Sequence, residues 1–361
     1  MDVQGRIERL LARLAQENVD AFLVMRPENR FYLSGFTGSA GALMVTPRQV
    51  YFMADFRYFE QAREQCPLCQ VVGFKESLYD ALAEKLPRWG VSRLGCEGDF
   101  LTYKQVVTLQ EKLENIQVTP LYGLVEELRQ VKDPGEIELL SRAVALADRA
   151  FEHILDYLKP GVTEWDVAVE LECFMRRLGA RKSAFDTIVA SGPRGALPHG
   201  VASHRVIREG DLVTMDFGCL YEGYNSDLTR TVVVVGSPHP RQKEIYDLVL
   251  AAQRAALAAV RAGVKACEVD RAAREVIASA GYGENFGHST GHGVGLAVHE
   301  DPSVSKKNET VLQPGMVITV EPGIYLPGWG GVRIEDMVVV EEQGCRILTR
   351  APKDPLPVVP V

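Results

Sequence analysis

Two segments of the chain combine apolar strands with pairs of acids, and this combination restricts the fold more than any other feature. Residues 212–218 and 225–235 form the first predicted strand pair, with Asp216 near the end of one strand and Asp227 near the start of the next. The midpoint between the two acids lies beside Glu222-Gly223, which is a turn signal. An antiparallel hairpin would therefore place Asp216 and Asp227 nearly opposite each other.

The same arrangement recurs later in the chain. A predicted strand over residues 316–321 ends on Glu321, residues 327–331 form the turn, and a return strand over residues 331–340 carries Glu335. Opposed side chains in a hairpin have Cβ atoms about 4.5–5.5 Å apart, and like charges are destabilising there. Carboxylates buried in such strands need a cation or must take up protons. The two hairpins together predict a metal site.

A glycine-rich segment between the hairpins, residues 287–295, supplies a fifth candidate ligand. It contains His288 and His292. The segment is too rich in glycine for a regular helix, so the pair is not the helical zinc motif, which also needs Glu after the first His. Four carboxylates and one imidazole favour Mn²⁺, Co²⁺ or Fe²⁺ without excluding Zn²⁺. Because four acids exceed the needs of one ion, we expect two ions about 3.5–4 Å apart.

Length and charge restrict the class of protein. The 361 residues are enough for two domains, and the net charge of −8 argues against a general nucleic-acid binder. No apolar run approaches the ~20 residues of a membrane helix, and the first residues lack the apolar core of a signal peptide. We therefore expect a cytoplasmic protein that binds neither membrane nor nucleic acid.

The chain divides into two parts that differ in their pattern of predicted helices and strands. The first ~125 residues alternate helix-like and strand-like patterns, which indicates an α/β domain. A break at residues 133–135 precedes a long amphipathic helix to about Leu158, and Thr163 can cap the next helix. Cys66 and Cys69 have a motif-like spacing. They lack a second cysteine pair and an electropositive helix start, so we expect ordinary thiols.

The candidate site resembles that of the pita-bread metallopeptidases, which include methionine aminopeptidase, aminopeptidase P and prolidase. The order Asp, Asp, His, Glu, Glu carries the resemblance. Within this group the chain is most similar to a short bacterial aminopeptidase P. The phrases that carry this similarity are Ser183-Ala184-Phe185-Asp186, Leu197-Pro198-His199-Gly200, Gly291-His292-Gly293, Glu321-Pro322-Gly323-Ile324-Tyr325 and Asp55-Phe56-Arg57-Tyr58.

The resemblance implies a mixed α/β (α+β) fold with two domains. A creatinase-like N-terminal α/β domain would cover residues 1–128, and a pita-bread catalytic domain residues 129–361. The ligand set implied for the two metal ions is Asp216 on one ion, Asp227 and Glu335 bridging both, and His292 and Glu321 on the second.

The resemblance also implies roles for residues around the metal. His199, His288 and His299 correspond to histidines near the scissile bond, and Glu321 to a group that takes and returns a proton. Tyr325 and Arg333 correspond to positions behind the ligands or in contact with substrate. From strand alternation we expect Arg333 to face the side that Glu335 does not, and an ion pair with a nearby acid is the alternative to substrate binding.

The function implied is hydrolysis of the bond between an N-terminal residue and a proline in the second position of a peptide. This is the activity of a Xaa-Pro aminopeptidase with two divalent ions, with Mn²⁺ expected before Co²⁺, Fe²⁺ or Zn²⁺. Two alternatives stay open: a Xaa-Pro dipeptidase (prolidase) and a non-catalytic peptide-binding relative. The resemblance also implies a homodimer, with the N-domain of one subunit near the cleft of the other.

Overall fold

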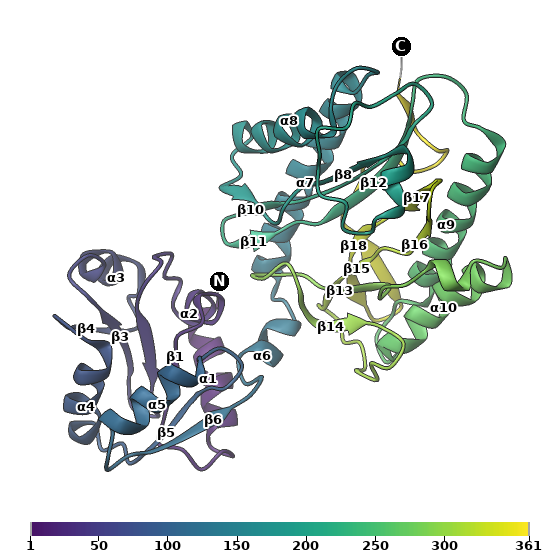
Figure 1. Cartoon of the computed structure of the whole chain (residues 1–361). Helices are drawn as coiled ribbons and strands as arrows, with labels where there is room; N and C mark the ends of the chain where they lie inside the picture. Colours follow the sequence, from purple (N-terminus) through teal and green to yellow (C-terminus); the bar gives the residue numbers. More distant parts are fainter. Residues whose placement is uncertain (1, 360–361) are drawn as a thin grey trace. The chain divides into compact units, whose positions relative to one another are not determined.

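The computed structural model describes residues 2–359. The chain divides into two compact units, Met1–Arg129 and Gln130–Val361 (Figure 1). All the candidate ligands and catalytic residues belong to the second unit. Among residues 2–359, no helix has both the length and the apolar character that crossing a membrane would require.

The first unit contains a mixed six-stranded sheet in the order β4-β3-β2-β1-β5-β6. The β1–β2 and β2–β3 pairs are antiparallel, and the other three pairs are parallel. Both β1 and β2 are buried at every residue, so both faces of the sheet are covered. Its elements are α1 (Val3–Leu14), β1 (Ala21–Val24), α2 (Pro27–Ser34), β2 (Ala42–Val45), β3 (Val50–Ala54), α3 (Phe59–Gln65), β4 (Gln70–Gly73), α4 (Leu78–Arg88), β5 (Arg93–Glu97), α5 (Tyr103–Lys112), β6 (Gln117–Leu121) and α6 (Glu126–Gln130), the last ending at the boundary.

The thiols of Cys66 and Cys69 lie in this first unit. Both are free, Cys66 is buried, and Cys69 is partly exposed. The backbone N–H of Cys69 donates to the carbonyl of Cys66 at 2.9 Å, which closes a tight turn after α3. The two thiols therefore belong to a part of the molecule that supplies none of the candidate ligands.

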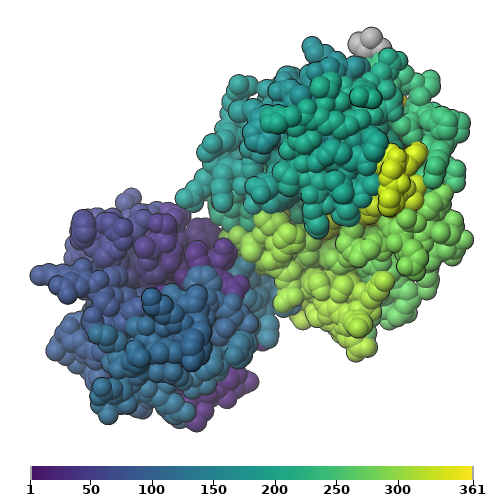
Figure 2. Space-filling model, in the orientation of Figure 1, coloured from purple at the N-terminus to yellow at the C-terminus, as the bar shows by residue number. Residues whose placement is uncertain are grey.

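The second unit is built in two halves, each with a pair of helices packed on strands. In the first half, α7 and α8 bury residues such as Phe151 and Leu171 against Val213 of β9. In the second half, α9 and α10 bury Val249 and Ile277 against β15 and its neighbours. Figure 2 shows the teal first half and the green second half meeting at the surface of this unit.

The elements of the first half are α7 (Pro134–Tyr157), α8 (Glu164–Arg177), β7 (Lys182–Ser183), β8 (Ile188–Ser191), η1 (Gly192–Ala196), β9 (Leu212–Phe217), β10 (Cys219–Tyr221), β11 (Tyr224–Asn225) and β12 (Leu228–Val234). Those of the second half are α9 (Pro240–Ala259), α10 (Ala266–Ser279), η2 (Gly283–Asn285), β13 (Gly291–Gly293), β14 (Glu300–Val304), β15 (Val317–Val320), β16 (Gly323–Leu326), β17 (Gly330–Arg333), β18 (Asp336–Glu341) and β19 (Gly344–Ile347), and β20 (Val358–Val359) returns to pair with β12.

Capping motifs define where the first two helices of this unit begin. The Asp133 carboxylate accepts from the backbone of Glu136, and the Glu136 carboxylate accepts in return from the backbone of Asp133. Thr163 and Asp166 form the same reciprocal pair at the start of α8. Each motif satisfies two backbone N–H groups that have no partner inside the helix. The predicted helix to about Leu158 and the predicted cap at Thr163 are confirmed.

The register of the first hairpin corrects the prediction that Asp216 lies opposite Asp227. Asp216 of β9 is opposite Thr229 of β12, and Asp227 lies two residues earlier on the same side. The cause is the turn: Glu222 and Gly223 have positive φ angles of 47° and 89°, so these two residues alone form the loop. The two acids are therefore diagonal neighbours rather than a directly opposed pair.

The second hairpin has the predicted register but a broken return strand. Val320 is opposite Asp336 and Gly323 is opposite Arg333, so the register places Glu321 across from Glu335. The predicted continuous strand over residues 331–340 is wrong, because β17 and β18 separate at Glu335. There the backbone N–H of Glu335 donates to the carbonyl of Thr229 at 3.2 Å, which joins the second hairpin to the first.

Candidate metal centre

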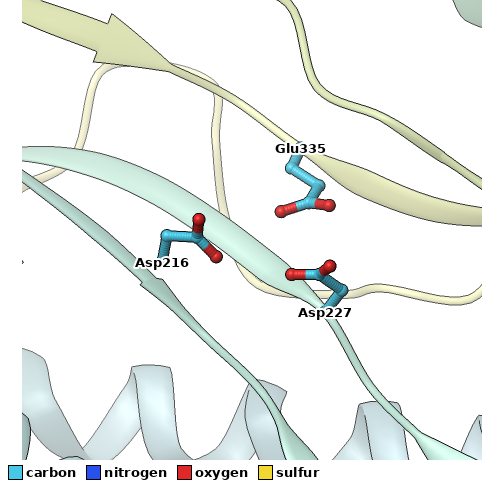
Figure 3. A group of neighbouring side chains, drawn as sticks. All are labelled: Asp216, Asp227 and Glu335. Atoms are coloured by element: carbon cyan, nitrogen blue, oxygen red, sulfur yellow. The ribbon is translucent and has the colours of Figure 1, made fainter. Parts of the chain in front are cut away.

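Three carboxylates converge where the two hairpins meet. Ligand atoms of Asp216, Asp227 and Glu335 all lie within 4.8 Å of one another, and the carboxyl groups point toward a common space (Figure 3). Asp227 is 5% exposed and Glu335 1% exposed. Burial raises the pKa of each of these carboxyls, and the charge of neighbouring acids adds to the effect. The cluster therefore has a strong requirement for protons or cations.

Two oxygen atoms of this cluster fit the role of metal ligands. Among residues 2–359, Oδ1 of Asp216 and Oε1 of Glu335 are buried atoms with no hydrogen-bond partner. A buried oxygen in that state is costly, because it has lost water without gaining another donor. A divalent cation bound by these oxygens would remove that cost, and oxygen donors suit hard divalent ions.

His292 and Glu321 extend the cluster on one side. His292 Nε2 lies 3.3 Å from Glu321 Oε1 and 3.5 Å from Asp227 Oδ2. His292 Nδ1 lies 3.0 Å from the carbonyl of Gly293, which can only accept, so Nδ1 carries the hydrogen. Nε2 is thus the nitrogen available to a metal, and its partner carbonyl fixes the ring as such contacts do in metal sites.

The charges of this pair oppose the effect of burial. Burial alone would raise the pKa of Glu321, but the hydrogen bond and charge of His292 lower it to about 2. Burial alone would lower the pKa of His292, but the bond to Glu321 raises it above its ordinary value. The structure therefore brings all five candidate ligands together, with His292 Nε2 and Glu321 Oε1 3.3 Å apart.

Arg333 lies against the carboxylates rather than away from them. The side chain is 3% exposed, and its Nη2 lies 2.5 Å from Asp216 Oδ2. Arg333 Nε donates to the hydroxyl of Thr229 at 3.1 Å, and that hydroxyl donates to Glu335 Oε2 at 2.9 Å. The expectation that Arg333 and Glu335 face opposite sides is wrong, because residues two apart on extended backbone share a face.

A chain of hydrogen bonds links Arg333 to His288. Arg333 Nη1 donates to the Tyr325 hydroxyl at 2.9 Å, and this hydroxyl lies 2.8 Å from His288 Nε2. His288 Nδ1 lies 2.7 Å from the carbonyl of Ser289 and so carries the ring hydrogen, which leaves Nε2 to accept from Tyr325. Burial lowers the pKa of His288, so its ring is neutral at neutral pH.

The two remaining histidines lie at the exposed edge of the site. The ring centroids of His299 and His292 are 4.2 Å apart. Partial burial lowers the pKa of His299, the charge of His292 lowers it further, and Glu321 opposes this change. The carbonyl of Pro198 accepts from Arg333 Nη1 at 3.0 Å. This bond connects the loop of His199 to the carboxylate cluster.

Two threonines that the sequence did not single out complete the centre. Thr229 contacts Arg333 and Glu335, as described above. The Thr319 hydroxyl accepts from the backbone N–H of His292 at 3.0 Å and donates to Glu321 Oε1 at 3.1 Å. Each threonine lies two residues from a candidate ligand, Thr229 from Asp227 and Thr319 from Glu321. This spacing on extended backbone was the available signal, because it puts both side chains on one face.

Comparison with known families accounts for both units. Residues 138–342 match the metallopeptidase family M24, and residues 6–131 match the creatinase/prolidase N-terminal domain. The first match covers more than half of the chain. The expected mixed α/β fold, with a creatinase-like N-terminal domain followed by a pita-bread domain, is confirmed.

Individual relatives agree along almost the whole chain. A solved Xaa-Pro dipeptidase from Bacillus anthracis is 46% identical, with a TM-score of 0.96 and coverage of 99% of both chains. A protein named Xaa-Pro dipeptidase from Pyrococcus furiosus is 42% identical over 98% of this chain and 99% of its own length. A solved X-Pro aminopeptidase from Thermotoga maritima is 40% identical, with a TM-score of 0.90 and coverage of 96% of this chain and 100% of its own. With its acid cluster and these matches, the chain belongs to metallopeptidase family M24, whose members use divalent metals.

Proposed function

We propose that this protein is a Xaa-Pro dipeptidase that acts with two divalent metal ions. The convergence of Asp216, Asp227 and Glu335 with His292 and Glu321 carries the proposal. The names of the Bacillus anthracis and Pyrococcus furiosus relatives support dipeptides as substrates. The sequence alone favoured an aminopeptidase, and these relatives favour the dipeptidase alternative instead.

Each of the two ions would be held by ligands from both hairpins. Asp216 would hold one ion, Asp227 and Glu335 both ions, and His292 and Glu321 the second. The buried oxygens of Asp216 and Glu335 that lack hydrogen-bond partners among residues 2–359 support this assignment. Mn²⁺ is the proposed ion, with Co²⁺, Fe²⁺ or Zn²⁺ as alternatives. When bound, such ions polarise the scissile carbonyl and make water a better nucleophile at neutral pH.

The protein side chains would move protons and orient the peptide. Glu321 would take up a proton and return it to the leaving nitrogen, as its place beside His292 and the carboxylate cluster allows. His288 is held in one tautomer by the Ser289 carbonyl and the Tyr325 hydroxyl, and would act on the substrate through the Tyr325 hydroxyl that it orients. His199 and His299 are exposed, which suits contact with an incoming peptide.

Substrate selection follows from the chemistry of proline. The amide before proline has no N–H, so an enzyme cannot recognise it through that group. A dipeptidase must instead hold the free carboxylate beyond the proline ring and exclude longer chains. We propose that His199 and His299 donate hydrogen bonds to the free carboxylate of the substrate. We propose that Arg333 and Tyr325 form another wall of the site, where Arg333 contacts Asp216 and Tyr325 contacts His288.

A Xaa-Pro aminopeptidase is the second candidate, since the Thermotoga maritima relative bears that name. The test compares hydrolysis of a Xaa-Pro dipeptide with that of a Xaa-Pro-Xaa tripeptide after chelation and reloading with Mn²⁺. At least tenfold faster dipeptide turnover supports the dipeptidase, and the reverse preference supports the aminopeptidase. Glu335→Gln should abolish turnover, while Glu342→Gln, an exposed acid outside the site, should retain it.

The same experiment addresses the non-catalytic alternative. Failure of the Mn²⁺-loaded protein to cleave either peptide would contradict both peptidase proposals. We also propose that the active protein is a homodimer, as the family resemblance implies. Light scattering at twice the mass of one chain is the expected result, and a mass equal to one chain would contradict it.

A further inference from the structure

A buried ion pair outside the proposed ligand set holds the loop of residues 286–292, which contains His288 and His292. Asp270 and Arg274 lie one turn apart on α10, and Asp270 is 1% exposed. Arg274 Nε and Nη2 lie 2.7 and 3.0 Å from the two oxygens of Asp270, so the pair is bidentate. Such paired contacts are stronger and better oriented than single hydrogen bonds.

Both members of the pair also bond to the segment that precedes His292. Asp270 Oδ1 accepts from the backbone N–H of Thr290 at 3.1 Å and from its hydroxyl at 2.9 Å. Arg274 Nη1 donates to the carbonyl of Phe286 at 2.9 Å, and Nη2 donates to the carbonyl of His288. The guanidinium also lies over the Phe286 ring, 4.1 Å from its centroid. One ion pair therefore holds three alternate residues, 286, 288 and 290.

The loop needs this support because of its composition. Gly287 lies between two of the held residues and Gly291 follows the last of them, and glycine loses more backbone entropy on ordering than any other residue. Residues 287–290 lie outside any helix or strand. An alanine Cβ at 291 would lie 2.0 Å from the carbonyl oxygen of Thr319, so the loop runs against β15 where only glycine fits.

Thr290 connects the ion pair on α10 to two proposed ligands, Glu321 and His292. Its carbonyl accepts from the backbone N–H of Glu321 at 2.7 Å. His292 follows two residues later and is held in turn by Thr319. The ion pair on α10 is thus connected to His288 directly through a carbonyl, and to Glu321 through Thr290.

We propose that Asp270 and Arg274 are positioning residues that fix the 286–292 loop so that His288 and His292 face the carboxylate cluster. The role of His292 as a ligand rests on the proposed function. Neither Asp270 nor Arg274 contacts the proposed metal site. Their effect therefore passes through the backbone of Phe286, His288 and Thr290.

The test uses isosteric changes that keep the fold. Asp270→Asn removes the charge, and Thr290→Val removes the hydroxyl, while Thr290→Ser keeps it. Ala273→Gly is the control. Ala273 is buried on α10 between Asp270 and Arg274, and its replacement by glycine destabilises the helix without removing a contact to the loop. For each variant, calorimetry measures Mn²⁺ affinity of the metal-free protein, and hydrogen exchange measures protection of the amides of residues 286–292.

Asp270→Asn and Thr290→Val should weaken Mn²⁺ binding about 10-fold, the lower end of the effect of removing a group bonded directly to a metal ligand, because these residues act through the loop backbone. Loop amides should lose protection in the same two variants. Thr290→Ser should restore affinity to within about threefold of wild type, and Ala273→Gly should lower the melting temperature without changing affinity. The proposal would be overturned if Asp270→Asn and Thr290→Val folded and kept wild-type Mn²⁺ affinity and wild-type protection of the loop amides. It would also be overturned if Ala273→Gly lost as much Mn²⁺ affinity and loop protection as these two variants.

These outcomes separate this proposal from the proposed function. A wild-type protein that binds Mn²⁺ without cleaving Xaa-Pro peptides would contradict the dipeptidase, and the affinities would still decide the role of Asp270. A wild-type protein that binds no Mn²⁺ would contradict the metal assignment. The amide exchange of the loop would then decide whether Asp270 and Arg274 position it.

Discussion

The order of stability of Glu335→Gln and wild type should be opposite in the metal-free and the metal-loaded proteins. Glu335 is 1% exposed, its Oε1 has no hydrogen-bond partner among residues 2–359, and its charge faces Asp216 and Asp227. An amide has nearly the same shape but no charge, and its NH₂ group can donate to either aspartate. Without metal, the variant should therefore be at least as stable as wild type.

The pH dependence of the metal-free proteins follows from the raised pKa of Glu335, caused first by burial and then by Glu321 and Asp216. A carboxyl whose pKa is raised in the folded state contributes stability below its ordinary pKa, and that contribution is lost as pH rises through the folded value. Metal-free wild type should therefore lose stability from acidic to neutral pH. Glu335→Gln lacks this contribution and should lose less.

Metal should reverse this order. At a free Mn²⁺ concentration of 100 times Kd, one site adds about 2.7 kcal/mol to the free energy of unfolding. For a unit of about 230 residues this corresponds to a rise in melting temperature of about 5–11 °C. A 100-fold weaker Kd in Glu335→Gln would reduce the gain to about 0.4 kcal/mol at the same concentration.

Thermal denaturation followed by circular dichroism, with chelator and with Mn²⁺, measures all four conditions. Glu342→Gln, an exposed acid, is the matched control and should respond to Mn²⁺ as wild type does. The reasoning would be refuted if metal-free Glu335→Gln melted well below metal-free wild type. It would also be refuted if Mn²⁺ raised the melting temperature of both proteins equally.

Three further predictions concern proton release, the hydrogen-bond chain and the His199 loop. Because the bond to Glu321 raises the pKa of His292 despite burial, Mn²⁺ must displace a proton from this ring, so Mn²⁺ affinity should fall as the pH is lowered from the alkaline side through the raised pKa. Calorimetry in buffers of different ionisation enthalpy counts the released protons, and a pH-independent Kd with no proton release would contradict this. Tyr325→Phe breaks the link from Arg333 to His288 and should lower kcat for a Xaa-Pro peptide about 10²-fold while leaving Mn²⁺ affinity within about threefold; unchanged kcat in steady-state assays would argue against it. Glu164 is fully buried and accepts hydrogen bonds from Ser191, Arg194 and Ser203, on either side of the His199 loop. Glu164→Gln should therefore lower the free energy of unfolding in urea by about 3–5 kcal/mol, and an unchanged midpoint would disprove that role.

Local sequence signals were enough to predict the helices and the presence of both hairpins. The caps at Asp133 and Thr163 use partners only three residues away, so the sequence alone contains the whole interaction. The Gly-rich turn at residues 327–331 likewise determines the register that puts Glu321 across from Glu335. The acids themselves were recognisable because charge in apolar strands is costly unless a cation binds it.

What could not be predicted depends on contacts between distant segments. The register of the first hairpin depends on Glu222 adopting a positive φ, which is uncommon for a residue other than glycine. The break between β17 and β18 depends on Glu335 pairing with Thr229 from the other hairpin. Strand alternation puts Arg333 on the same side as Glu335, but its contact with Asp216 follows from the meeting of the two hairpins, which one segment could not reveal.

The choice between dipeptides and longer peptides also lay beyond the sequence motifs. The five candidate ligands are compatible with either proposed activity, since the metal ions they would hold act on the scissile bond in both. Selection depends on how the site holds the substrate beyond the proline ring, and we proposed the exposed His199 and His299 for that role. The names of the relatives, rather than any motif in this chain, shifted the proposal toward the dipeptidase.

A crystal structure of the Mn²⁺-loaded protein, with anomalous diffraction data collected at the manganese edge, tests the central claim most directly. The account predicts two anomalous peaks per chain, both within coordination distance of Asp227 and Glu335. Asp216 would complete one site, and His292 with Glu321 the other. Peaks elsewhere, or no peak among these side chains at saturating Mn²⁺, would contradict the account.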